Sequence, residues 1–407
     1  RVAVAKCTSP EGTILTNEGP GKPWTFVDRL GPIYTHDRVV TIPSERGVIV
    51  PKSNGVRLTL VGNLPQFTQV PVWESAVVLH DSEGFDLDFT LEEGRVLITN
   101  RKDKGPAKVH INVGEESWTL TLADPGDEIL IEAWSRWMQG MPFQKDPKFA
   151  DEPTTAALAL VLSGNVSLKS GAREFALSAP PGLAVFEFES KQARPSTPRR
   201  VDAIPAALDP AKWNKPEWKT ARERADRLLE DAKKNDIPTA LVNVLKAAHE
   251  ASDKAQAQEI IDQAVFTMGA LDQLDLLVDT LGGNVGAERE AAVSALRHWI
   301  GRDGKQDMAL YNFLIKDKKY SEGAAEILVG LLHSFGETDL SRAETFDTLI
   351  RYLRNDKLPI RELAYWHLTR VVPDNKIAYD PAGTKESWEK AFADWKKLVP
   401  NGKVPGK

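Results

Sequence analysis

Residues 76–100, AVVLHDSEGFDLDFTLEEGRVLITN, decide how the first half of the chain folds. In residues 85–91 apolar and polar side chains alternate, and this period of two is typical of a half-buried strand. Glu93-Gly94 predicts a tight turn, because glycine adopts a positive φ without a steric cost. We therefore expect three strands joined by two short turns.

Four carboxylates in this stretch, those of Asp86, Asp88, Glu92 and Glu93, are the type of ligand that a hard cation such as calcium prefers. They also fit the solvated face of a half-buried strand, and this is the interpretation that we favour. We accordingly predict no metal site and no cofactor.

Residues 1–190 have the pattern of an all-β domain. Short apolar segments alternate with turns rich in glycine, proline and asparagine, which predicts a sandwich, a jelly roll or a barrel. Residues 56–61 alternate regularly, and residues 129–133 form another short strand candidate. Five tryptophans are candidates for the core of this domain: Trp24, Trp73, Trp118, Trp134 and Trp137.

Three glycines share a local pattern in which a β-branched residue follows two positions later. They are Gly12, Gly94 and Gly164, and an apolar strand continues after each of them. We interpret the pattern as a hairpin whose turn requires glycine, and we assign the three residues a structural role.

The run from residue 12 to residue 63 resembles the FecR-type domain, an extracytoplasmic domain of iron-citrate signalling regulators. The matching positions are Gly12, Trp24, Leu30-Gly31, Asp37, Val40-Thr41 and Asn54-Gly55-Val56. LEEGRVLIT (residues 91–99) and LVLSGNVSLKSG (residues 160–171) are similar to later strands of the family. PGDEILIEA (residues 125–133) resembles a further strand, except that Asp127 replaces the usual threonine. The resemblance spans about residues 5–188 and implies a sandwich or jelly-roll domain that lies outside the cytoplasmic membrane.

Residues 191–216 contain five prolines and a group of basic side chains, and few long apolar ones. Such a composition does not support a core, so we predict a solvated linker. Contact with an acidic partner or with lipid headgroups is the alternative.

Residues 217–407 are predicted to be helical and contain an internal repeat. Residues 274–303 align with residues 346–375 at a constant offset of 72, so that Arg289 matches Arg361. The shared pattern, a helix, a short turn and an R-E-x-A-x-x-x-L helix, resembles HEAT-type repeats and implies a stacked solenoid. The resemblance also implies that Arg289 and Arg361 are structural, each bonded to an acidic group in a neighbouring repeat.

The common catalytic motifs are missing from the sequence, and the lone Cys7 has no identifiable partner group. We therefore expect that the protein is not an enzyme and assign no catalytic residue. Six residues are weak candidates for a binding surface, although core packing is the favoured interpretation for most of them: Trp134, Trp137, Arg297, His298, Trp366 and His367.

A net charge of −6 argues against a general nucleic-acid binder, which would carry excess positive charge. Because the chain begins with Arg1 rather than methionine, we expect that an upstream segment has been removed, and a signal peptide or a membrane anchor could have been part of it. The leading hypothesis is a non-enzymatic periplasmic or cell-envelope protein that binds a protein partner, as a scaffold or an anti-sigma-type signalling module. The alternatives are a glycan- or cell-wall-binding structural protein and a hydrolase with an unrecognised site.

Overall fold

The structure, a computed structural model, describes residues 1–10, 12–19, 21–63, 72–146, 151–192, 197–205 and 208–400, without the side chain of Asn214. Contacts divide the chain into two compact units. Unit 1 comprises Arg1–Ser135 and Thr154–Leu271, and unit 2 comprises Arg136–Pro153 and Asp272–Lys407. The first three helices thus belong with the strands, whereas we had expected one helical domain from residue 217 onward.

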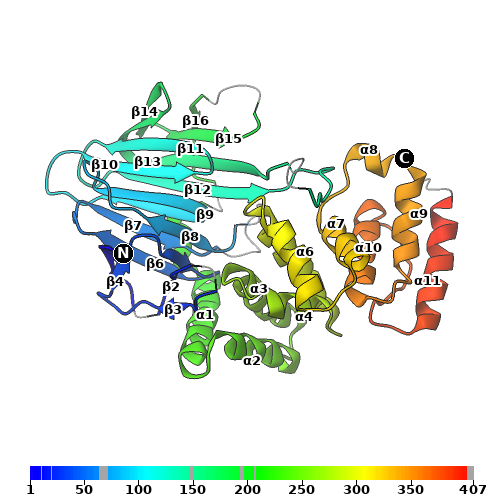
Figure 1. Ribbon diagram of the computed structural model, residues 1–407. Helices are drawn as coiled ribbons and strands as arrows, with labels where there is room; N and C mark the ends of the chain where they lie inside the picture. The colour runs from blue at the N-terminus through cyan, green and yellow to red at the C-terminus, as the bar shows by residue number, and fades with distance from the viewer. Residues whose placement is uncertain are drawn as a thin grey trace. The chain divides into compact units, whose positions relative to one another are not determined.

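The strands run in chain order as follows: β1 (Ala3–Cys7), β2 (Leu15–Asn17), β3 (Thr25–Phe26), β4 (Pro32–Tyr34), β5 (Arg38–Thr41), β6 (Arg46–Pro51), β7 (Val56–Val61), β8 (Ser75–Leu79), β9 (Leu87–Asn100), β10 (Ala107–Val113), β11 (Glu116–Leu122), β12 (Glu128–Arg136), β13 (Thr154–Ser170), β14 (Arg173–Ala179), β15 (Leu183–Glu189) and β16 (Arg199–Val201). Figure 1 shows β7, β9, β12 and β13 as neighbouring strands, in agreement with their pairing. The predicted β-rich first half is confirmed.

Two strands, β9 and β13, are much longer than the others. β9 pairs with β8 and β10 through its first half and with β7 and β12 through its second half. The change of partners occurs at Gly94, which has a φ of +103°. Gly164 lies inside β13 in the same way, with a φ of +81°.

The hairpin turns predicted at the three glycines are therefore wrong. Gly94 and Gly164 lie within continuous strands, and Gly12 precedes β2, which pairs with β3 and β5 rather than with β1. The positive φ that we predicted at Gly94 is confirmed, and Gly12 and Gly164 also have a positive φ. The sequence indicates that the backbone needs glycine, but a bend within a strand and a hairpin turn place the same demand on it.

A closed ring of five strands follows from the pairing order β9–β10–β11–β13–β12 and back to β9. Its interior is apolar, and Trp118 lies fully buried in it with an edge-to-face contact to Phe186 at a centroid separation of 5.6 Å. Eight of the other strands extend from β9, through β7, β6, β1 and β4 on one side and through β8, β5, β2 and β3 on the other. The last three attach to β13, which pairs with β14 and with β15, and β15 pairs with β16.

The segment predicted as a solvated linker is partly folded. β16 pairs with β15, and a 3-10 helix, Pro210–Asn214, follows with Asp209 as its N-cap. Leu208 and Trp213 are buried against Leu97 and Leu130 of the strands. A few apolar side chains in a proline-rich segment are thus enough to anchor it on an existing apolar surface.

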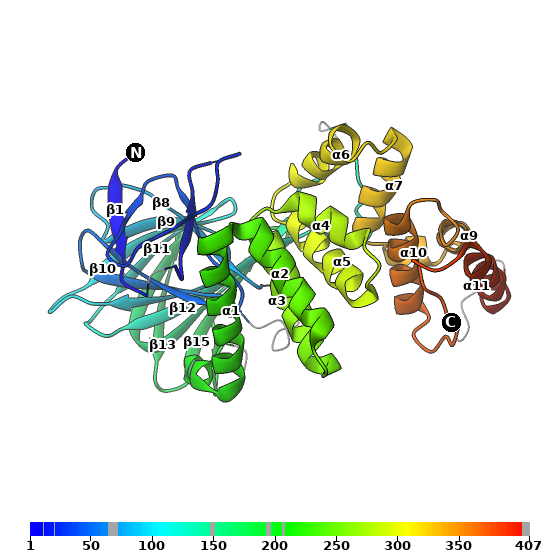
Figure 2. The same ribbon diagram turned by 90° about the horizontal axis from the view of Figure 1, so that it is seen from below.

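Three helices complete unit 1: α1 (Pro216–Asn235), α2 (Ile237–Glu250) and α3 (Lys254–Ala270). Figure 2 shows α1, α2 and α3 in green, packed in succession. The Phe266 ring of α3 stacks on Trp73 at 3.8 Å between ring centroids, and Trp24 Nε1 donates to the Leu271 carbonyl at 2.8 Å. These contacts join the helices to the strand region.

Unit 2 contains the helices α4 (Leu274–Leu281), α5 (Gly286–Gly301), α6 (Gln306–Lys316), α7 (Glu322–Leu332), α8 (Glu337–Leu340), α9 (Ala343–Tyr352), α10 (Leu358–Val371) and α11 (Lys385–Leu398). α5 and α10 begin 72 residues apart, as the sequence repeat predicts, and α4 and α9 precede them. Each member of the pairs α4–α5, α6–α7 and α9–α10 packs on the other. Among the described residues, no helix combines the length and apolar composition that crossing a membrane requires.

We predict that Gly94→Ala destabilises the protein by about 3 kcal/mol, because the residue would need a positive φ and its Cβ would lie 2.3 Å from the Glu74 carbonyl oxygen and the Ser75 Cα. Urea unfolding of the variant measures this loss. Gly171→Ala is the control, because its φ is also positive but no atom lies within 4 Å of the added Cβ. It should cost about 1 kcal/mol. Equal losses in both variants would show that φ alone, and not the close approach of β8, requires Gly94.

Candidate functional site

The two tryptophans among the binding-surface candidates of the first half, Trp134 and Trp137, fall in different units. Trp134 lies near the end of β12 in unit 1 and is half-buried. Trp137 belongs to unit 2, where its Nε1 donates to the Ile300 carbonyl at 2.9 Å and its ring lies 4.8 Å from that of His333. Trp137 therefore serves to pack unit 2.

Trp137 is part of a non-helical segment, residues 136–146, that packs on the helices of unit 2. Phe143 contacts the Tyr311 ring at 5.5 Å, and the Met141 carbonyl lies 3.1 Å from His333 Nδ1. Gly140 N donates to the Ser334 carbonyl at 3.0 Å. Aromatic side chains and backbone hydrogen bonds together hold this segment on the helices.

Three of the remaining binding candidates come together in unit 2. The Arg297 guanidinium lies over the Trp366 ring at 4.8 Å, and the His367 ring meets that of Trp366 at 4.9 Å. Arg370, which the sequence did not single out, also lies over Trp366, at 3.6 Å. His298 is buried one position after Arg297 on α5, so it points to a different side of that helix.

The polar groups of this cluster are engaged in packing. Arg297 donates to the Leu332 carbonyl at 2.6 Å, and burial lowers its pKa to about 10, with a smaller contribution from Arg370. Burial lowers the pKa of His367 to about 4, so its imidazole is neutral at pH 7 and donates from Nε2 to the Leu331 carbonyl at 2.7 Å. The cluster fixes the C-terminal end of α7 against α5 and α10.

Arg289 and Arg361 have equivalent contacts in the two repeats. Each donates to the carbonyl six residues earlier, that of Gly283 at 3.1 Å and that of Asn355 at 2.6 Å. Arg289 also binds Glu362 of the other repeat, and both side chains are almost fully buried. This is the type of contact that the HEAT resemblance implies. Arg361 differs, because its Nε donates to the backbone carbonyl of Pro381.

Two of the acidic residues that we placed on a solvated face are in fact buried. Asp88 is 7% exposed and Glu93 is 1% exposed. Near the point where β9 changes its pairing partners, side chains on both of its faces are buried. The alternation of polar and apolar residues therefore does not indicate a solvent-exposed face there.

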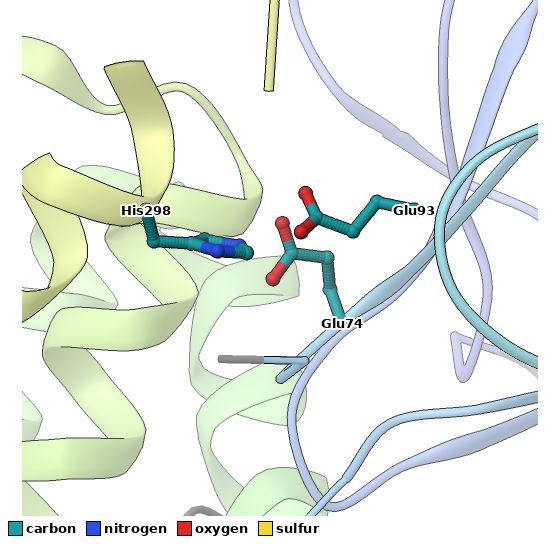
Figure 3. A group of neighbouring side chains, drawn as sticks. All are labelled: Glu74, Glu93 and His298. Atoms are coloured by element: carbon teal, nitrogen blue, oxygen red, sulfur yellow. The ribbon is translucent and has the colours of Figure 1, made fainter. Parts of the chain in front are cut away.

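Glu93 and Glu74 place two buried carboxylates close together in unit 1. Figure 3 shows their oxygens facing one another, and one oxygen of each lies within 4.8 Å of the other. His298, also drawn in Figure 3, belongs to unit 2. Next to Glu93, the fully buried Arg95 is paired with Glu132, so the bend of β9 concentrates charged groups.

Polar side chains gather on the face of unit 1 formed by β9, β10 and β11. His110 Nδ1 lies 2.9 Å from Asp88 Oδ1, and His110 Nε2 lies 2.8 Å from Ser117 Oγ. A cavity of about 180 Å³ lies beside Asp88 and is also lined by Phe85 and Ser82. The sequence offered no signal for this group, because the three strands that carry it become neighbours only through their pairing.

Glu45 is a buried acid where α1 meets the strands. Burial raises its pKa to about 8, and the nearby Asp226 raises it further, whereas Arg222 acts in the opposite direction. The Arg222 Nε lies 3.9 Å from Glu45 Oε1, too far for a hydrogen bond to offset the desolvation.

Stability should fall as the pH rises through the raised pKa of Glu45. The folded state retains the proton more tightly than the unfolded chain, so this stabilisation is complete below about pH 4.5 and is lost by about pH 8. Glu45→Gln should remove this dependence and make the variant the more stable protein at pH 9. Urea unfolding at pH 5, 7 and 9 measures the effect. Glu187→Gln is the control, because Arg199 lowers the pKa of Glu187. An unchanged pH slope in Glu45→Gln would contradict the assignment.

Arg289→Ala should lower the free energy of unfolding by about 3–5 kcal/mol, because it leaves the buried Glu362 carboxylate without its cation. Adding Glu362→Gln should recover part of this loss, since burial already raises the pKa of Glu362 and disfavours its charge. Lys396→Ala, which breaks an exposed pair with Asp347, should cost less than about 1 kcal/mol. Equal losses for Arg289→Ala and Lys396→Ala would show that the buried pair has no special role.

No protein-family model matches the chain, and comparison with curated proteins and with solved structures finds no match either. The FecR-type and HEAT-type resemblances therefore remain inferences from the sequence.

Proposed function

We propose that the protein acts chiefly by binding other proteins, as a scaffold or signalling module of the cell envelope. The observation that carries this proposal is the non-helical segment of residues 136–146, which packs on the helices of unit 2. Trp137 and Phe143 serve as aromatic anchors, and backbone hydrogen bonds lie between them. Anchors of this type dominate the energetics of most protein–peptide contacts.

The proposed solenoid extends this role to a larger surface. The interval of 72 residues between the starts of α5 and α10 and the equivalent carbonyl contacts of Arg289 and Arg361 support a HEAT-like stack. Stacked helix pairs present the extended surfaces with which repeat proteins bind their partners.

For the strands we propose a FecR-type domain, supported by the motif positions and by glycines at Gly94 and Gly164 that the backbone requires. This assignment places the protein in the periplasm or at the cell envelope. Fractionation of cells that express the native gene tests the location, and recovery of the whole product in the cytosol would contradict it. The glycan alternative relied on a tryptophan-rich strand domain for sugar stacking, and Trp137 belongs to unit 2 rather than to that domain.

A synthetic peptide of residues 136–146 should bind the double variant Trp137→Ala/Phe143→Ala with a Kd in the micromolar range, about −8 kcal/mol. The variant loses both anchors, so the site becomes free for the peptide. In the unaltered chain the tethered segment competes at a high effective concentration, and peptide binding should be much weaker. Fluorescence anisotropy of the labelled peptide with the full chain measures both affinities.

Two controls make the result specific. A peptide with alanine at both aromatic positions should not bind, and the variant Met138→Ala should behave like the unaltered chain, because that side chain is exposed. Equal binding to all forms of the protein, or no binding to a double variant that retains its circular dichroism spectrum, would contradict a peptide-accepting site.

A further inference from the structure

The face of β9, β10 and β11 in unit 1 carries an aspartate, a histidine and a serine joined by two hydrogen bonds. Asp88 Oδ1 lies 2.9 Å from His110 Nδ1, and His110 Nε2 lies 2.8 Å from Ser117 Oγ. The order of groups and the use of the two ring nitrogens are those that serine hydrolases need for nucleophilic attack.

Strand register places these side chains on one face. β9 and β10 are parallel with His110 opposite Asp88, and β10 and β11 are antiparallel with Asn112 opposite Ser117. Residues that lie opposite one another project to the same side, and so do residues two apart on a strand. The three functional groups therefore share the side of the sheet that faces away from the apolar interior.

The surroundings of the histidine fix its tautomer. Asp88 is 7% exposed, and its second oxygen accepts a hydrogen bond from Ser82. A carboxylate only accepts hydrogen bonds, so neutral His110 carries its proton on Nδ1 and offers the lone pair of Nε2 to the Ser117 hydroxyl. The Phe85 ring lies 5.2 Å from that of His110 and limits its rotation.

Solvent exposure increases from the aspartate through the histidine to the serine, as a serine nucleophile requires. Asp88 is buried, His110 is half-buried and Ser117 is exposed, so a substrate reaches the hydroxyl without any opening of the fold. Asn112 lies directly across from Ser117 in the register and is also half-buried. Its side-chain amide is within reach of a carbonyl oxygen held at Ser117, where it would stabilise a developing negative charge.

We propose that Ser117 is the nucleophile of a hydrolytic site for carboxylic esters. Ser117 Oγ attacks the ester carbonyl carbon while its proton passes to His110 Nε2. The tetrahedral intermediate then expels the alcohol, which takes that proton, and an acyl-serine remains. Water attacks the acyl-serine with His110 as base, which releases the carboxylic acid and restores Ser117. Asp88 is a positioning residue that holds the imidazole, and Asn112 donates to the oxyanion.

This activity goes beyond the proposed binding role and uses different residues, so each proposal can fail without the other. It also gives the hydrolase alternative a defined set of residues, which scattered positions in the sequence could not supply.

The test uses the full chain with a fluorophosphonate probe and with p-nitrophenyl acetate. We expect the probe to label Ser117, and we expect acetate-ester hydrolysis with an acetyl adduct at Ser117 detected by peptide mass spectrometry. Ser117→Ala should abolish the labelling and reduce hydrolysis to the rate of heat-denatured protein. His110→Gln should lower the rate by about 10²-fold or more. Asn112→Ala should lower kcat by about 10²-fold with little change in KM.

Thr119→Ala is the matched control, because Thr119 lies on the same strand and the same face, opposite His110. Its rate should stay within about twofold of the unaltered protein, and circular dichroism should show that every variant is folded. The proposal is overturned if the probe does not label Ser117 above the denatured control. It is also overturned if Ser117→Ala hydrolyses the ester as fast as the unaltered protein, because the three groups would then be only a hydrogen-bonded link between strands.

Discussion

The body of unit 1 depends on two strands that each pair with two sets of neighbours. β9 and β13 close the five-stranded ring and also continue beyond it to strands outside the ring. A strand can do this only if its backbone changes direction without breaking its hydrogen bonds. Gly94 and Gly164 provide that change at positive φ, and a Cβ at Gly94 would collide with the backbone of the residues that begin β8.

The bend of β9 also explains why charge is concentrated in the interior. Arg95 follows Gly94 directly and is paired with Glu132, while Glu93 precedes it and faces Glu74. Buried charges of this kind are tolerated where partners satisfy them, and removal of one partner is costly. Glu45 avoids a buried charge in a different way, because its raised pKa keeps the carboxyl group protonated and neutral near pH 7.

In unit 2, too, buried charged and polar side chains are satisfied by partners, here on neighbouring helices. Arg289 joins the two repeats through Glu362, and Arg297 and His367 fasten the end of α7 through backbone carbonyls. The segment of residues 136–146 adds aromatic contacts from a part of the chain that lies between two strands in sequence. The chain enters unit 2 at Arg136 and returns to unit 1 at Thr154, so the two units are linked covalently on both sides of this stretch.

The sequence by itself determined the elements that depend on local patterns. The alternation of apolar and polar residues predicted the exact bounds of β7. The repeat offset of 72 residues equals the distance in sequence between the starts of α5 and α10. Both predictions succeed because they depend only on residues that are near one another in the sequence. The sequence also identified three backbone positions that need glycine, but it could not distinguish a hairpin turn from a bend within a strand. Only strand pairing makes that distinction. Only the tertiary structure brings Asp88, His110 and Ser117 together. It also buries two acidic residues that we expected on a solvated face, and it places residues 136–146 among the helices of unit 2. Each of these outcomes depends on which segments, distant in sequence, become neighbours in space, and a local pattern of side chains does not specify those neighbours.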